Sequence, residues 1–347
     1  MIEQLVFKIP GAFAQCIADG SCQRYGTIIK NSAGTIVGHI QESGALSKVI
    51  SYAPSILASG NPITAIATAA TLVLDVGATI NTNMRVRRMD IKLDQVMTMV
   101  ESLKTLSFVN IGVSTLGLGV SVAGFYLMNN KLNGLGNKVD ELSHSVKAGF
   151  IKLHQAKIRE HISAVQGLLT DADVAHHSMN AANEYVRIAQ CLDAEYAFFH
   201  GEIGFAMKQE HLNLVEVEQL IQLMSVAHNA RTRCLILADE YCLARSKSEQ
   251  NAEHYGSLFD DVDVIELTHR LLATQTESDF MKAFNDTLHG NDQLIGTKDF
   301  IANMREVSAV ASSKSFLIDK LTKDEVPGKL FFDQLSRQKE PIVVISN

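Results

Sequence analysis

The chain has 347 residues with a formal net charge of −7, and 46% of its residues are hydrophobic while 20% are charged. This balance is typical of a folded protein of one large or two smaller domains, and it excludes a disordered chain. The negative charge argues against nucleic acid as the main partner. The five cysteines are scattered and odd in number, and the first ten residues lack the apolar core of an export signal. We therefore expect a reducing, cytoplasmic environment.

Residues 1–43 are predicted to form a small element that contains β-structure. Its pieces are a strand over 2–9, a short helix over 11–20, and a β-hairpin over 24–41 that turns at 31–34. Gly34 supplies the positive φ that such a turn requires. Because a hairpin and one strand are rarely stable alone, this element must pack on the rest of the chain. It is either a docking surface for a protein partner or a cap on a helical body.

Residues 44–131 form an apolar helical region with two uncharged runs. The first run is interrupted by Pro54, Gly60 and Pro62, so it is not one continuous span. Its longest uncharged piece, residues 63–74, suits a buried helix or a re-entrant segment better than a membrane crossing. Two apolar runs close together can cover each other in a soluble form of the protein.

The second run, residues 108–128, carries no charge over 21 positions and is the candidate membrane-inserting segment. As one helix it rises about 32 Å, enough for a hydrocarbon core of about 30 Å. The side chains that favour insertion are Val109, Ile111, Val113, Leu116, Leu118, Val120, Val122, Phe125 and Leu127. Four glycines and the polar residues Asn110, Ser114 and Thr115 oppose it, so insertion of a lone helix is marginal.

The small residues in this run are compatible with two geometries in a membrane and with a third geometry in a soluble protein. Gly117 with Ser121, and Gly119 with Ala123, have the small-xxx-small spacing that lets helices pack closely in a bilayer. The same glycines allow a bend at 116–119, which would make the run an apolar hairpin tip. In the third geometry the run is a helix buried inside a helical protein.

A basic cluster precedes the run and consists of Arg85, Arg87 and Arg88. Arginines beside an apolar segment favour contact with anionic headgroups on the cytoplasmic side of a membrane. A solvated helix face is the alternative interpretation.

Apolar residues repeat at heptad spacing on both sides of the run. They are Val86, Met89, Leu93, Val96, Val100 and Leu103 upstream, and Leu132, Leu135, Val139, Leu142 and Val146 downstream. Such repeats are typical of coiled-coil arms, and a bend in the run would bring the two arms together antiparallel. We predict a mainly α fold: an elongated helical bundle with coiled-coil arms around a central apolar helix or hairpin, plus the small N-terminal β-hairpin element.

The rest of the chain reads as helical. Residues 132–250 keep helical periodicity with few breakers and are predicted to be a long-helix bundle. Residues 251–347 continue as shorter helices and end in a possible strand at 341–346. Because a lone strand is rarely stable, we hypothesise that it pairs with the N-terminal sheet.

The polar residues show no motif for catalysis, so we expect no enzyme activity, no cofactor and no metal site. The two Glu-x-x-His spacings, close to the number expected by chance, are Glu141/His144 and Glu266/His269. A polar pocket around Glu195, His200 and Glu202 is conceivable, but their spacing is not that of metal ligands.

Arms that carry an uncharged tip, over residues 45–170, are similar in layout to α-helical pore-forming toxins and to helical cell-death and phage-defence effectors of bacteria. The resemblance is one of organisation and not of motif. It implies a toxin-like effector, soluble when made, that inserts residues 108–128 into membrane lipid and assembles as a homo-oligomer. The alternative is a soluble oligomeric scaffold or adaptor in which 108–128 is a buried core helix.

Overall fold

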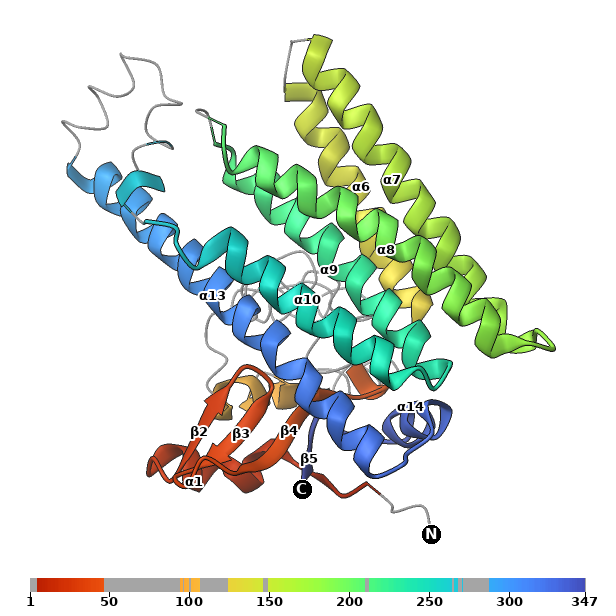
Figure 1. Cartoon of the computed structure of the whole chain (residues 1–347). Coiled ribbons are helices and arrows are strands. Elements are labelled where there is room, and N and C mark those ends of the chain that lie inside the picture. The colour runs from red at the N-terminus through yellow and green to blue at the C-terminus, as the bar shows by residue number, and fades with distance from the viewer. Residues whose placement is uncertain are drawn as a thin grey trace, which may run out of the picture.

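The computed structural model describes residues 5–46, 94–106 without 96 and 100, 124–145, 149–209, 212–263, 265–267, 270 and 287–346. Within these ranges the protein is mainly helical, with a five-stranded antiparallel sheet built from both ends of the chain (Figure 1). The predictions of a mainly α fold and of β-structure near the N-terminus are confirmed.

The long helices lie in three pairs that pack side by side (Figure 1). The pairs are α6 (Phe125–Ser145) with α7 (Gly149–Val174), α8 (Ala181–Ala206) with α9 (Leu214–Leu237), and α10 (Tyr241–Phe259) with α13 (Thr287–Lys323). Helix α9 is buried along most of its length, because α6, α8, α10 and the short α14 (Gly328–Ser336) all pack against it. A helix covered on every side is typical of the centre of a bundle.

The sheet joins the two ends of the chain. Its strands, in the order β1-β5-β4-β3-β2, are β1 (Phe7–Lys8), β5 (Ile342–Ser346), β4 (Ile36–Glu42), β3 (Ile28–Asn31) and β2 (Cys22–Tyr25). The short helices are η1 (Pro10–Phe13), α1 (Ala14–Ala18) and η2 (Ala175–His177). Because β5 lies between β1 and β4, the hypothesis that the C-terminal strand pairs with the N-terminal sheet is confirmed.

Strand β5 separates two hydrophobic cores. Ile342 and Val344 belong to a smaller cluster that we call the sheet core, and Val343 and Ile345 belong to the larger helical core. Successive side chains of a strand point to opposite faces, so both faces of β5 are covered. This explains why its sequence is a continuous apolar run and not an alternation.

One predicted strand is divided by a turn. The hairpin at residues 31–34 is confirmed, with Gly34 at a φ of 77°. The expectation that its first strand runs on through Gly26 is wrong, because β2 and β3 form their own antiparallel pair with Tyr25 opposite Ile28. Gly26 has a φ of 53°, a left-handed conformation that occurs in turns and not in strands. Glycine adopts this conformation without the strain that a Cβ atom would cause.

Cysteine pairing is a second feature that the sequence did not suggest. Cys16 and Cys22 are disulfide-bonded between α1 and β2, while Cys191, Cys234 and Cys242 are free. Disulfides are more typical of oxidising compartments, so the cytoplasmic location stays a prediction.

The heptad residues that the structure describes are buried, but in two different places. Leu132, Leu135 and Val139 of α6 lie in the helical core, whereas Leu103 lies in the sheet core. The other heptad residues lie outside the residues whose side chains are described. The antiparallel packing of the two arms on each other therefore stays a prediction.

Helix α13 crosses the β2–β3 hairpin and is fixed to it by polar contacts. Arg24 donates hydrogen bonds to both carboxylate oxygens of Glu306, at 2.5 and 3.2 Å. The backbone N–H of Thr27 donates to Oγ of Ser313 at 2.7 Å. Gly26 lies so close to α13 that a Cβ atom there would overlap the backbone carbonyl of Ala309.

We expect Gly26→Ala to destabilise the protein far more than Gly34→Ala. Both residues have positive φ, which costs about 1–2 kcal/mol for alanine, but only Gly26 abuts another backbone. The overlap with Ala309 adds about 1–3 kcal/mol of overpacking. Urea unfolding of the two variants measures the difference. Equal losses would show that α13 does not press on this turn.

Candidate functional site

The predicted membrane segment overlaps the described residues only at its end, where it is packed. Phe125 and Leu127 are buried, with exposed fractions of 4% and 8%. The other predicted residues lie outside the described ranges: Val109, Ile111, Val113, Leu116, Leu118, Val120, Val122, Gly117, Gly119, Ser121, Ala123, Arg85, Arg87 and Arg88. Among the helices that are described, none combines the length and apolarity that a bilayer crossing needs.

The first turn of α6 is anchored in both hydrophobic cores. The guanidinium of Arg233 on α9 lies 5.2 Å from the ring centre of Phe125 and 4.1 Å from that of Phe332 on α14. Such cation–π contacts contribute about 0.5–2 kcal/mol each. Leu127 points the other way, into the sheet core, while Tyr126 is 68% exposed. The last residues of the uncharged run are thus tied to α9, α14 and the sheet.

One and a half turns later, α6 buries an amine. Lys131 is only 5% exposed, and burial lowers its pKa to about 8, although the carboxylate of Glu42 acts in the opposite direction. Glu42 also acts on Arg233 and on the buried Lys314, which donates to Asn229 at 2.8 Å. Burial lowers the pKa of Lys314 to about 8 as well. Buried charge of this kind costs stability.

The strongest polar cluster lies between α8, α9 and α10, and its centre is Arg231. This guanidinium has no solvent exposure, stacks 4.5 Å above the ring centre of Tyr196 and is ion-paired with Asp193. It also donates to Nδ1 of His228 at 2.9 Å and to the carbonyl of Lys247 at 3.2 Å. Three helices therefore converge on one buried positive charge.

Two further histidines continue this cluster toward the surface. The hydroxyl of Tyr196 lies 3.0 Å from Nδ1 of His254, whose ring stacks on that of His200 at 4.1 Å. We call His200, His228 and His254 the histidine cluster. Burial lowers the pKa of each of the three, and the charge of Arg231 adds to this effect at His228 and His254. These histidines are neutral near neutral pH.

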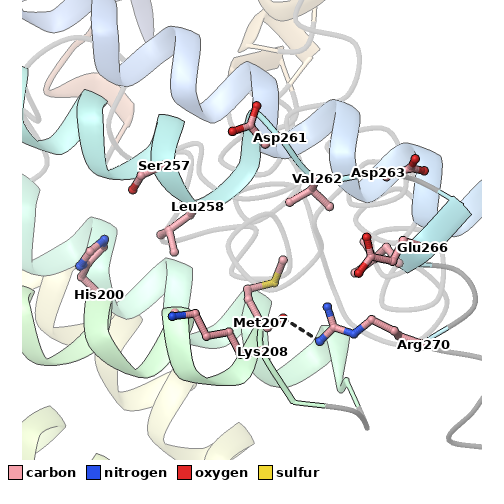
Figure 2. A pocket seen from close by; sticks show the side chains of 12 residues that line it. His200, Met207, Lys208, Ser257, Leu258, Asp261, Val262, Asp263, Glu266 and Arg270 are labelled. Atoms are coloured by element: carbon pink, nitrogen blue, oxygen red, sulfur yellow. Dashed lines mark hydrogen bonds between the residues drawn. The ribbon is translucent and has the colours of Figure 1, made fainter.

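His200 also lines a pocket of about 430 Å³ at the ends of α8 and α10 (Figure 2). Lys208 and Arg270 supply positive charge there, and acidic residues lie across the pocket from His200: Asp261, Asp263 and Glu266. Arg270 donates to the backbone carbonyl of Met207 at 2.6 Å, which closes one side of the pocket. The pocket brings solvent to the outer end of the histidine cluster.

The residues of the conceivable Glu195–His200–Glu202 pocket do not converge. A carboxylate oxygen of Glu195 lies 2.7 Å from Nδ1 of His161, and one of Glu202 lies 3.5 Å from Nε2 of His154. Both carboxylates therefore face α7, whereas His200 faces α10. Within the described part of the chain, no three His, Cys, Asp or Glu side chains are grouped as metal ligands are.

Sequence reasoning missed the ion pair of Arg231 with Asp193, in which the guanidinium is fully buried. Their partners come from three helices, so no spacing in the sequence signals them. The one local signal is the i, i+3 pair of His228 with Arg231 on α9, which is otherwise apolar.

The fold and the cluster place the chain in a broad structural class: a mainly helical protein with a sheet built from both ends of the chain and a buried charged cluster. Comparison with protein families, with curated proteins and with solved structures finds no match to this chain.

We expect Asp193→Asn to destabilise the protein by about 3 kcal/mol, because it leaves the buried charge of Arg231 uncompensated. Burial alone would raise the pKa of Asp193, but Lys247 and Arg231 outweigh this and hold it below its usual value. The control is Glu184→Gln, which breaks a solvent-exposed pair with Arg187 on the same helix and should leave stability nearly unchanged. Urea unfolding of both variants measures the two losses, and similar losses would contradict a central role for Arg231.

We expect Lys131→Met to stabilise the protein by about 2–3 kcal/mol at neutral pH, since it removes a buried amine whose pKa is depressed. Between about pH 8 and about pH 10 the unfolded wild type binds more protons than the folded form, so its stability rises with pH, and the variant lacks this rise. Unfolding free energies across that range test both statements. Lys323→Met, at an exposed position of α13, is the control and should change stability by less than about 0.5 kcal/mol. A destabilised Lys131→Met would mean that the amine has a compensating partner.

Proposed function

We propose that this chain is a membrane-associating helical protein, soluble before activation, that inserts residues 108–128. In this proposal it is a pore-forming or membrane-disrupting effector of the bacterial cell-death or defence type. The observation that carries the proposal is the junction at Gly124. There an uncharged run leads directly into α6, whose first turn is packed on α9, α14 and the sheet core. An apolar tip on a packed helical stem is the arrangement that such an effector needs.

The packing of the stem sets the order in which residues would reach lipid. Removing a side chain such as Phe125 or Leu127 from a protein core costs about 1.5–3 kcal/mol. We therefore propose that residues 109–122 contact lipid first, and that Phe125 and Leu127 follow only when the start of α6 leaves the two cores. The buried amine of Lys131 weakens the docking of α6 and so lowers the cost of that release.

We further propose surfaces of this chain for self-assembly, for lipid headgroups and for a protein partner. Homo-oligomers would form through Gly117 with Ser121 and Gly119 with Ala123, and the coiled-coil arms would extend the bundle. Arg85, Arg87 and Arg88 would contact anionic headgroups from the cytoplasmic side. Strand β2 is at an edge of the sheet, the type of surface to which a strand of a protein partner adds.

The second candidate is a soluble oligomeric scaffold or adaptor. The burial of Phe125 and Leu127 favours it, because the end of the uncharged run is already part of the protein core. In this case the whole run is a core helix, and no state of the protein contacts lipid.

Val120→Lys separates the two candidates. If the run inserts into lipid, the variant stays folded but no longer floats with liposomes or releases an entrapped dye, because a lysine at mid-bilayer costs about 3 kcal/mol. If the run is a core helix, the variant unfolds, since an unpaired buried charge is not tolerated. Circular dichroism and liposome flotation of the same preparation measure both outcomes.

The matched control is Val174→Lys, which places the same change at an exposed position at the end of α7. It should alter neither folding nor flotation. If the wild type neither floats nor releases dye at neutral or acidic pH, the membrane proposal is lost.

A further inference from the structure

Five histidines in the described part of the helical bundle differ in the charges that face them. On α7, His154 lies near Glu202 and Glu216, and His161 lies near Glu195. A proton added to either imidazole there would be attracted by a carboxylate. Two histidines of the cluster of α8, α9 and α10 have the opposite surroundings, because the guanidinium of Arg231 contacts His228 and its charge acts on His254.

The charges around the histidine cluster come from every helix that packs on it. Helix α9 contributes Arg231, α13 contributes Lys314, α10 contributes Lys247, and α8 contributes Asp193. The carboxylate of Asp193 is engaged, since Lys247 donates to it at 2.6 Å and Arg231 pairs with its other oxygen. The carboxylates of the pocket lie across it from His200 (Figure 2). A proton added to the cluster therefore meets mainly positive charge.

The hydrogen bond between Arg231 and His228 requires a neutral imidazole ring. A guanidinium donates and never accepts, so Nδ1 of His228 must accept the hydrogen bond from Arg231 and carry no proton. Protonation would place two donors 2.9 Å apart and break this bond. The hydroxyl of Tyr196 lies 3.0 Å from Nδ1 of His254, and either of the two groups can donate in this contact.

Protons can reach this cluster from solvent. The ring of His200 is partly buried and lines the pocket at the ends of α8 and α10, whereas its Nε2 atom is itself buried and has no hydrogen-bond partner. Its ring stacks on that of His254 at an interplanar angle of 19°, so a charge on one ring faces the other. Two imidazolium rings stacked in this way repel each other.

We propose that His200, His228 and His254 form an acid-sensitive lock that holds α10 and α13 against α8 and α9, and that their protonation opens this interface. Below about pH 6.5 the opened form takes up protons that the closed form excludes, so closure weakens as the pH falls. Each proton taken up raises the opening equilibrium about tenfold per pH unit. Helix α7 stays in place, because carboxylates face its histidines His154 and His161.

This inference names the trigger of the proposed membrane association, and in that respect it rests on the proposed function. The uncharged run links residues 94–106, which pack in the sheet core, to α6, which packs on α9. Opening would separate α14 from α9 and so remove Phe332 from Arg233, the contact that fixes Phe125. Acid would thus loosen the anchor at the end of the run.

The test is hydrogen exchange of the full chain without lipid, from about pH 7.5 to about pH 5, after correction for the intrinsic exchange rate. The protection of α10 and α13 amides should fall at least about tenfold per pH unit below about pH 6.5, while α7 keeps its protection. The variant His200→Gln/His254→Gln should show a weaker pH dependence, because glutamine keeps a polar side chain without titrating and only His228 of the cluster remains. The control His154→Gln/His161→Gln should retain the pH dependence of the wild type.

Three results would overturn the lock: pH-independent protection of α10, equal loss of protection in α7, or an unchanged profile in the His200/His254 variant. If that variant does not fold, imidazole NMR titration of the wild type replaces it. The cluster resonances should then stay neutral until α10 opens and titrate together with the opening. Three independent titrations in the closed form would exclude the lock.

Flotation with vesicles of phosphatidylglycerol and phosphatidylethanolamine distinguishes this inference from the proposed function. Opening in acid without flotation supports the lock and removes the membrane proposal. Flotation that is equal at both ends of the pH range, with no opening of α10, removes the lock and supports the membrane proposal.

Discussion

The packing of α8, α9 and α10 on one another depends on the buried positive charge of Arg231. Arg231 has no exposure to solvent and sits at mid-bundle, where isolating a charge would cost several kcal/mol. It is tolerated because α8 supplies Asp193 and the face of Tyr196, α9 supplies His228, and α10 supplies a backbone carbonyl. These contacts hold three helices in one relative position, which apolar packing alone specifies less strictly.

The same arrangement explains why the surrounding histidines are neutral. The guanidinium of Arg231 donates to the lone pair on Nδ1 of His228, so this nitrogen carries no proton. Burial and the charge of Arg231 both disfavour the protonated form of His228. The histidines of α7 have carboxylates as their charged neighbours, whereas His228 has the guanidinium of Arg231. The helical body therefore contains two groups of histidines with opposite charge surroundings.

The parts of the fold that follow from local physics could be predicted from the sequence, and the parts that depend on long-range contacts could not. The short apolar run at 342–346 needs a partner strand, which is why its pairing with the N-terminal sheet was predictable. The turn at Gly26 was missed because its cause is the approach of α13, which lies about 280 residues away in the chain. Arg231 was missed for the same reason, since each of its partners belongs to a different turn or helix. The apolar run could be recognised by its lack of charge, but the anchoring of Phe125 by Arg233 and Phe332 has no signature in sequence.

Helix α9 connects the two functional proposals. Arg231 and Arg233 are two residues apart, so they project about 200° from each other around the helix. One faces the histidine cluster between α8 and α10, and the other faces Phe125 at the end of the uncharged run. The histidine cluster and the contact of Arg233 with Phe125 are therefore separated by only the width of one helix. Because α9 is buried and closely packed, it transmits a displacement as a rigid element.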